Sequence, residues 1–367
     1  MIAKLTRQIL QFTRRQLLLA LFTGFTFTSV ANADGLLTTN SNKGGSQQNM
    51  WQDAPSLPYK VQEIYPAIVD DFIVVAGGLS PDVDQNKIGV SSRVVVFDIA
   101  RSQWLEGLAL PEPRHHPMLV TVNKRLFAFG GFTKDSKGMW HNSVDVLELV
   151  NFGIDNIKSQ VTGEWKKVAM LPAPLAETLS GVYNNKVHLV SGRTPESMEI
   201  NSQWNDQHDV SSHLIFDPDT LSFTHGPAIP TARNSACSVV VNNSLHTIGG
   251  RTVAGGNLNT HEVFNFATQK WETRSPLPDA QGGLACASLN HRIYVFGGEY
   301  FNNGGGVYST VWEYDIAQDK WQATSEMPNP RHGLGALTVD QGIYVIGGAL
   351  QAGGNQTSAL MRIFTPN

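Results

Sequence analysis

The sequence predicts an all-β chain that folds as a six-bladed β-propeller, with the last blade closed by the N-terminal strand. An aromatic residue, a proline seven positions later and a glycine nineteen positions after that recur six times along the chain. A short apolar run precedes each of these glycines, and an alternating run precedes most of the later aromatic residues. With 34 glycines and 18 prolines in 367 residues, the composition suits many short strands joined by tight turns.

The first 33 residues are predicted to be an export signal outside the fold. An uncharged apolar stretch runs from residue 17 to residue 30, and residues 31–33 (ANA) match a small-residue cleavage site. The basic residues before this stretch are Lys4, Arg7, Arg14 and Arg15. Residues 13–18 (TRRQLL) resemble the twin-arginine export motif. An uncleaved membrane anchor is the alternative, although the stretch is short for a spanning helix.

Residues 34–49, rich in Asn, Ser, Gly and Gln, are expected to form a flexible leader. Cleavage of the signal removes four of the 27 Lys and Arg residues, which leaves 23 against 31 Asp and Glu and a formal charge of −8. A chain with this charge is not expected to bind nucleic acid. We expect a periplasmic or secreted protein with no integral membrane segment after cleavage.

Residues 51–367 are predicted to form the six blades, one for each repeat. The recurring sets are Trp51-Pro58-Gly77, Trp104-Pro111-Gly130, Trp165-Pro172-Ser191, Phe223-Pro230-Gly249, Trp271-Pro278-Gly297 and Trp321-Pro328-Gly347. The apolar run before each glycine, such as residues 343–346, is typical of a buried strand that ends in a tight turn. The alternating run that follows supplies the third strand, and the aromatic residue marks the fourth.

The two ends of the repeat region are complementary. The segment around Trp51 has no strands of its own before it, and the last repeat stops at residues 361–364 without a tryptophan strand after it. We expect the N-terminal segment to become the fourth strand of the last blade, because this closure removes exposed strand edges.

This pattern resembles the kelch repeat over residues 51–367. In export, length, blade number and a long third-blade loop, the chain is most similar to bacterial secreted six-bladed kelch proteins of the N-acetylneuraminate epimerase (sialic acid mutarotase) type. The resemblance implies an isomerase that opens and recloses a sugar ring by acid–base chemistry. The proposed catalytic glutamate of that family follows the glycine pair of the fourth blade, where this chain has Arg251, and a glutamate takes the equivalent position one blade later as Glu299. The resemblance therefore implies Glu299 as the acid/base.

The repeat geometry also nominates a site. Segments just after the repeat proline and just after the glycine pair should converge on one mouth of the central channel. Candidates after the prolines are Arg114, Arg233, Arg331 and His332, and those after the glycine pairs are Arg193, Arg251 and Glu299. Long loops on the same face carry Trp140, Trp204 and Tyr300.

From these residues we predict a positively biased funnel for a small anionic carbohydrate. The five arginines are candidates for holding a carboxylate, Glu299 and His332 for catalysis, and Trp140 and Tyr300 for stacking on the sugar. Alternatively, an arginine after a repeat proline is structural and bonds loop carbonyls or a neighbouring carboxylate. A non-catalytic module that binds a glycan or another envelope protein is the alternative function, so enzymatic activity stays an open question.

No cofactor or metal is expected. His115 and His116 are adjacent, so they should face opposite ways on a strand. Galactose-oxidase chemistry, which kelch propellers also host, requires copper and a cysteine linked to a tyrosine. Cys237 and Cys286 lie in predicted first strands, away from any ligand cluster. They occupy non-equivalent positions of neighbouring repeats, so we expect their side chains to point apart, although a single bridge is left open.

Overall fold

The computed structural model describes residues 50–83, 88–135, 137–155, 157–197 and 203–367. The predicted export signal and leader lie outside the described residues. In the described part of the chain no helix is both long enough and apolar enough to cross a membrane.

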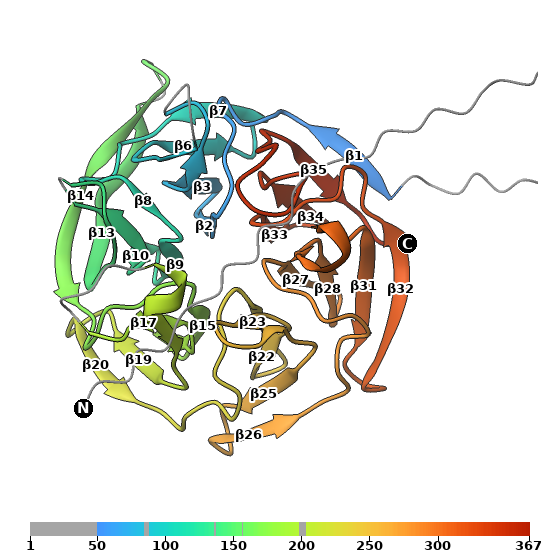
Figure 1. Ribbon diagram of the computed structural model, residues 1–367. Helices are drawn as coiled ribbons and strands as arrows, with labels where there is room; N and C mark the ends of the chain where they lie inside the picture. Colours follow the sequence, from blue (N-terminus) through green and yellow to red (C-terminus); the bar gives the residue numbers. More distant parts are fainter. Residues whose placement is uncertain (1–49, 84–87, 136, 156, 198–202) are drawn as a thin grey trace, which may run out of the picture. The chain divides into compact units, whose positions relative to one another are not determined.

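Six four-stranded antiparallel sheets surround a central axis as blades, which confirms the predicted fold class (Figure 1). Blade 1 consists of β2 (Ala67–Val69), β3 (Phe72–Ala76), β6 (Val94–Asp98) and β7 (Gln103–Glu106). Blade 2 consists of β9 (Met118–Val122), β10 (Arg125–Phe129), β13 (Asp145–Asp155) and β14 (Gln160–Met170). Blade 3 consists of β15 (Leu179–Tyr183), β16 (Lys186–Val190), β19 (His213–Asp217) and β20 (Ser222–His225).

Blades 4 to 6 continue in the same order. Blade 4 consists of β21 (Cys237–Val241), β22 (Ser244–Ile248), β25 (His261–Asn265) and β26 (Lys270–Thr273). Blade 5 consists of β27 (Ala285–Leu289), β28 (Arg292–Phe296), β31 (Thr310–Asp315) and β32 (Lys320–Glu326). Blade 6 consists of β33 (Gly335–Val339), β34 (Gly342–Ile346), β35 (Met361–Phe364) and β1 (Trp51–Ala54). The first strand of each blade is the innermost one (Figure 1).

Short ribbons and turns rise from the connections between second and third strands. In blade 2, β11 (Phe132–Lys134) pairs with β12 (Trp140–Asn142) and with β8 (Arg114–His115), which lies in the connection that enters β9. The other blades with such ribbons have β4 (Leu79–Ser80) with β5 (Gly89–Val90), β17 (Arg193–Pro195) with β18 (Gln207–Asp209), β23 (Arg251–Thr252) with β24 (Gly256–Asn257), and β29 (Glu299–Tyr300) with β30 (Gly306–Val307). Two single turns of 3₁₀ helix, η1 (Trp204–Asp206) and η2 (Asn302–Gly304), lie in the same connections. These connections carry the site.

The N-terminal strand closes the ring, as the sequence predicts. β1 pairs antiparallel with β35, with Trp51 opposite Phe364. The Trp51 ring is buried, with its centroid 5.0 Å from the ring of Phe364 and 5.9 Å from the ring of Phe296. The strand is therefore anchored in the core between blades 5 and 6 as well as by its backbone bonds.

The glycine pair of each repeat marks a close approach between neighbouring blades. Gly77 has φ +70°, and a Cβ at this position would collide with the carbonyl oxygen of Arg114 in the next blade. The third repeat has Ser191 there, also at positive φ, and its hydroxyl donates to the carbonyl of Arg233 at 2.7 Å. The exception thus keeps the contact between blades by a hydrogen bond.

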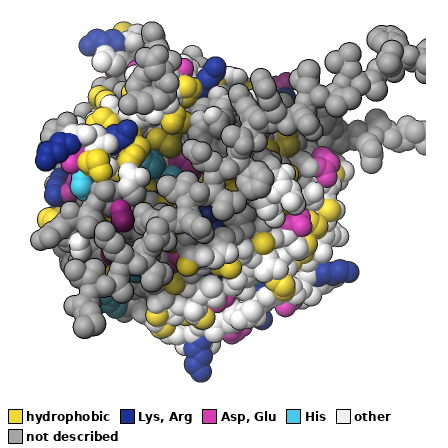
Figure 2. Space-filling view, in the orientation of Figure 1, with side chains coloured by type: hydrophobic (Ala, Val, Ile, Leu, Met, Phe, Trp, Pro, Cys, Tyr) yellow, Lys and Arg dark blue, Asp and Glu magenta, His cyan; other side chains and the backbone are white. Residues whose placement is uncertain are grey.

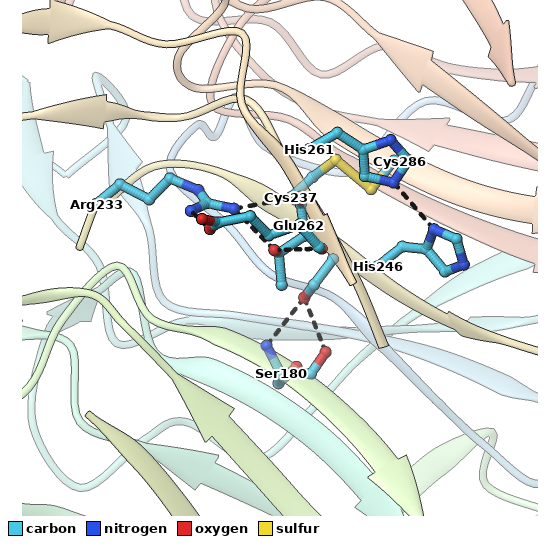
Figure 3. Close-up of a disulfide and its surroundings, with 9 residues drawn as sticks. Ser180, Arg233, Cys237, His246, His261, Glu262 and Cys286 are labelled. Carbon is cyan, nitrogen blue, oxygen red and sulfur yellow. Dashed lines mark hydrogen bonds and ion pairs between the residues drawn. A yellow bond between two sulfur atoms is a disulfide. The ribbon is translucent and has the colours of Figure 1, made fainter. Parts of the chain in front are cut away.

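The cysteine expectation is wrong, because Cys237 and Cys286 form a disulfide with their Cα atoms 5.7 Å apart (Figure 3). Within their repeats, the two cysteines differ in position by one residue. Because side chains alternate between the two faces of a sheet, this offset suggested that the two side chains point apart. Blades, however, pack face against face. The residue of β21 that points toward blade 5 and the residue of β27 that points toward blade 4 must lie on opposite faces of their own sheets, so the offset brings the sulfur atoms together.

Candidate functional site

A cavity of about 800 Å³ opens on the face that carries the loop ribbons. Its walls come from all six blades, through the segments after the repeat prolines and after the glycine pairs. Figure 2, in the orientation of Figure 1, shows histidine and acidic side chains beside apolar ones on the described part of this face. The convergence of these segments is as the sequence predicts.

Around this cavity, acidic and basic side chains alternate from one blade to the next. This alternating ring consists of Glu63, His116, Glu177, Arg251, Glu299 and His332. His116 Nε2 donates to Glu63 Oε2 at 2.6 Å and lies 3.8 Å from Glu177 Oε1. On the other side, Arg251 Nη1 lies 2.6 Å from Glu299 Oε1. His332 Nδ1 then lies 3.4 Å from Glu299 Oε2 and 3.6 Å from Glu63 Oε1, so these contacts run from Arg251 round to Glu177.

The floor of the cavity is built from the fifth residue after each repeat proline. These residues, all in the left-handed region with φ between +48° and +69°, are Glu63, His116, Glu177, Ser235, Gly283 and Gly333. Neighbouring floor residues bond through their backbones. Glu63 N donates to Gly333 O at 2.7 Å, and Gly333 N donates to Gly283 O at 2.9 Å. The blades are thereby joined to one another directly beneath the site.

Sequence reasoning missed these floor residues, because it stopped at the third and fourth positions after the proline. A signal was present, since the fifth position is glycine in two of the repeats. Glycine is the residue best suited to positive φ, and a non-glycine residue there carries strain of about 1 kcal/mol or more. Strain of this kind clusters at functional sites.

Charge pairing keeps Glu63 and Glu177 ionised. Burial alone would raise the pKa of Glu63, but His116, His332 and Arg251 hold it well below its usual range. Burial would likewise raise the pKa of Glu177, and Arg193 and His116 outweigh it so that the pKa falls. Burial of His115, followed by the charge of His116, puts its pKa well below the usual range, so His115 is neutral.

Of the residues predicted from sequence, four line the cavity: Arg193, Arg251, Glu299 and Tyr300. The guanidinium of Arg193 lies between two aromatic rings, 4.7 Å from the centroid of Phe132 and 4.6 Å from that of Trp204. Its Nη2 donates to Glu177 at 2.6 Å, whereas its Nε and Nη1 are buried and have no acceptor among the described residues. Arg193 is thus held in place, and two of its nitrogen donors, Nε and Nη1, remain without a partner among the described residues.

Three other predicted arginines lie inside the blade walls. Arg114, Arg233 and Arg331 are at most 1% exposed and do not line the cavity. Arg114 Nη1 donates to Gly130 O at 2.7 Å, and Arg331 Nε donates to Gly347 O at 2.6 Å. Arg233 pairs with Glu262 at 2.5 Å (Figure 3). Their placement matches the alternative that an arginine after a repeat proline is structural. Their side chains follow the interface between blades to the glycine-pair turns.

The remaining two predicted residues support the site from behind. His332 is 1% exposed, and its Nε2 donates to the carbonyls of Gln351 at 2.9 Å and Gly353 at 3.0 Å. Trp140 packs edge-on against His115, 4.4 Å between ring centroids, and is not among the residues that line the cavity. The expected positive bias is therefore corrected. Two arginines face the cavity with three carboxylates, and each arginine is already paired.

The rest of the cavity wall is aromatic. Trp204, Tyr300, Phe301 and Tyr308 line it, and Phe301 is 63% exposed. Tyr300 and Tyr308 meet edge to face at 5.1 Å between centroids. Among the described residues no group of three or more His, Cys, Asp or Glu side chains is placed to hold a metal ion.

Comparison with known proteins agrees with this architecture. Residues 183–364 match the family model described as the KLHDC2/KLHL20/DRC7 Kelch-repeats domain. The solved structure of YjhT superposes with a TM-score of 0.69, covering 84% of this chain and 95% of that one at 18% identity. The chain is a six-bladed β-propeller with a polar, aromatic-rimmed cavity at one end of its axis, and its residues 183–364 are similar to kelch repeats.

Among curated relatives, the chain is 24% identical over 258 residues to Kelch-like protein terF of Aspergillus terreus, which covers 68% of this chain and 53% of that protein. It is 24% identical over 235 residues to Beta-scruin of Limulus polyphemus, covering 62% of this chain and 23% of that protein. The chain thus spans about half, or less, of the length of these relatives, and the similarity concerns their kelch repeats.

Proposed function

We propose that the cavity binds a small acidic carbohydrate and catalyses the opening and reclosing of its ring. The observation that carries this proposal is Arg193, whose Nε and Nη1 are buried at the cavity without a protein acceptor. A buried donor without a partner is costly, and a ligand carboxylate that accepts from Nη1 or Nε would satisfy one of these donors with a charge-assisted hydrogen bond. Because Phe132 and Trp204 fix the plane of the guanidinium, the ligand finds it already oriented.

The walls suit a sugar. A volume of about 800 Å³ lies within the range of small-molecule sites. Trp204 and Tyr300 offer aromatic faces on which the C–H face of a sugar ring can stack, while Asn257 and the ring of ionisable groups offer partners for its hydroxyls. Resemblance to the N-acetylneuraminate epimerase type supports an acidic sugar.

Ring opening and reclosing requires proton removal and delivery, and the alternating ring supplies carboxylates and imidazoles at the cavity floor. Glu299, the acid/base implied by the resemblance, lies there beside Arg251. The Cys237–Cys286 disulfide supports an exported, periplasmic or secreted protein, because disulfides persist in oxidising compartments.

A ligand panel tests the binding half of this proposal. We expect N-acetylneuraminate or a hexuronate, but not glucose or galactose, to raise the melting temperature of the protein, because a ligand specific to the folded state stabilises it. Arg193→Met should weaken that binding by about 10- to 100-fold, as expected for loss of hydrogen bonds to a charged group. The exposed Arg274→Met serves as the matched control and should bind normally. Absence of any sugar-induced shift would favour a non-catalytic, protein-binding scaffold.

A further inference from the structure

Glu63 is the carboxylate of the alternating ring that has an oxygen left for a ligand. Its Oε2 accepts from His116 Nε2 at 2.6 Å. Its Oε1 accepts no hydrogen bond from the described residues, since the nearest cationic nitrogen, His332 Nδ1, lies 3.6 Å away. Glu63 lines the cavity with a side chain that is 13% exposed.

The other two carboxylates have both oxygens engaged. Glu177 accepts from Arg193 Nη2 on Oε1 and from the Ser235 hydroxyl on Oε2. Glu299 accepts from Arg251 on Oε1 at 2.6 Å and from the backbone N–H of Gly353 on Oε2 at 2.7 Å. We propose that Glu63, held by His116, is the general base of this cavity and that Glu299 serves to hold Arg251. This inference rests on the proposed function.

His116 is itself fixed at both ring nitrogens. Its Nδ1 lies 2.7 Å from His115 Nδ1, so a proton lies between the two imidazoles. His115 in turn stacks on Phe132 at 4.8 Å and meets the edge of Trp140 at 4.4 Å. Glu63 and His116 are neighbours along the floor and both have positive φ. The short hydrogen bond and the backbone conformation of the two residues hold the Glu63 carboxylate in one orientation, and the low pKa of Glu63 makes it an ionised but weak proton acceptor.

Gly333 positions this carboxylate. A Cβ at Gly333 would lie 2.9 Å from both Cδ and Oε1 of Glu63, so only glycine leaves room for the carboxylate. Gly138, an exposed glycine that does not line the cavity, also has positive φ, and a Cβ there would meet nothing within 4 Å. Alanine at either position therefore carries similar backbone strain, and only alanine at 333 displaces Glu63.

The chemical step balances as follows. Glu63 Oε1 takes the proton of the anomeric hydroxyl, whose O–H electron pair forms the new carbonyl. The bond between the anomeric carbon and the ring oxygen breaks, and its electron pair stays on the ring oxygen, which takes a proton from water in the open cavity. The hydroxide left behind takes the proton from Glu63, so no proton is gained or lost. Reclosure on the other face of the carbonyl gives the other anomer.

Turnover and binding measured separately test the role of Glu63. With N-acetylneuraminate or the hexuronate that binds, we expect Glu63→Gln to lower the anomer exchange rate, measured by NMR, about 100-fold or more while Kd changes less than threefold. Gly333→Ala should lower the rate about 10-fold or more, and Gly138→Ala should stay within threefold of the native rate. Thermal melts establish that each variant is folded. Native-like turnover in Glu63→Gln, or equal losses in the two alanine variants, would overturn the inference alone, whereas no turnover in the native protein would overturn the proposed reaction as well.

A pH profile gives a readout that a structural role would not change. The titratable and charged groups that face Glu63 are Tyr65, His115, His116, Arg251 and His332. His116 is the cation that contributes most to keeping Glu63 ionised. In His116→Gln the pKa of Glu63 should therefore rise, and the acid limb of kcat/KM should move to higher pH. An acid limb that stays in place would contradict the pairing of Glu63 with His116.

Discussion

The five arginines nominated for the site fall into two groups that differ in what satisfies their guanidinium groups. Those after a repeat proline bond carbonyls and carboxylates inside the blade walls, as Arg331 does with the carbonyls of Gly347 and Asn329. Those after a glycine pair reach the cavity, as Arg193 and Arg251 do. A guanidinium has five donors, so the distinction lies in how many of them the protein itself occupies.

Replacing Arg331 tests the structural group. Burial lowers the pKa of Arg331 to about 10, so it stays charged at neutral pH. We expect Arg331→Met to reduce the free energy of unfolding by about 2–4 kcal/mol, because buried carbonyls lose their donors. Urea denaturation measures this. Sugar affinity should be unchanged, and a large loss of affinity with little loss of stability would contradict the structural role.

At the scale of strands, two connections hold the ring together where the repeats alone do not. One is β1, which completes blade 6 by pairing with β35. The other is the disulfide between β21 and β27, which joins the innermost strands of blades 4 and 5. The first joins the two ends of the propeller, and the second joins neighbouring blades beside the axis.

The anchor of β1 is Trp51. Its ring is 6% exposed and packs on Phe296 and Phe364. We expect Trp51→Ala to lower the free energy of unfolding by about 3–5 kcal/mol, as for other buried large aromatic residues. Hydrogen exchange should show the loss of protection first in β35. Uniform loss across all blades would indicate that closure is not a local property of blade 6.

The disulfide spans 49 residues of sequence. Loop-closure entropy for a loop of about this length corresponds to about 4 kcal/mol at 25 °C, with measured effects commonly about 2–4 kcal/mol. The double variant Cys237→Ala, Cys286→Ala should lose stability in this range, and dithiothreitol should lower the stability of the native protein but not of the variant. Equal responses of the two proteins to the reductant would show that the bond does not form in solution.

For the molecule as a whole, four buried histidines make stability depend on pH. His188 contacts His213 in blade 3, and His246 contacts His261 in blade 4, with ring nitrogens 2.8 and 2.9 Å apart (Figure 3 shows the second pair). Burial, the largest cause, lowers the pKa of His188 and His246 to about 4 and that of His261 to about 3. Burial also lowers the pKa of His213. His188, His246 and His261 are therefore neutral in the folded state at pH 6.

The unfolded chain binds protons at these histidines near pH 6.5, before the folded state does. The stability that they contribute is therefore complete above about pH 6.5 and is lost as the pH falls toward about 4, at up to about 1.4 kcal/mol per pH unit for each histidine. We expect His246→Gln to flatten the dependence of unfolding free energy on pH by about one proton. The exposed His225→Gln is the matched control. Equal slopes in both variants would contradict this account.

Local sequence patterns were enough to predict the six blades, the closing strand and the segments that meet at the cavity. Strand periodicity, the glycine-pair turns and the unmatched ends at Trp51 and Phe364 are written within a few residues of chain, so sequence alone reveals them. Four residues nominated from the sequence, Arg193, Arg251, Glu299 and Tyr300, line the cavity, and their roles stay predictions.

Packing between distant segments decided the rest. Whether an arginine turns into a wall or a cavity, as Arg331 and Arg193 do, depends on which carbonyls a neighbouring blade presents. The disulfide depends on two sheets facing each other, and the Glu63–His116 pair depends on backbone bonds between blades that hold both residues at positive φ. The residues in these contacts lie about 50 positions apart, and neither segment has a repeating pattern that indicates its partner. The contacts within the alternating ring could therefore be identified only from the tertiary structure.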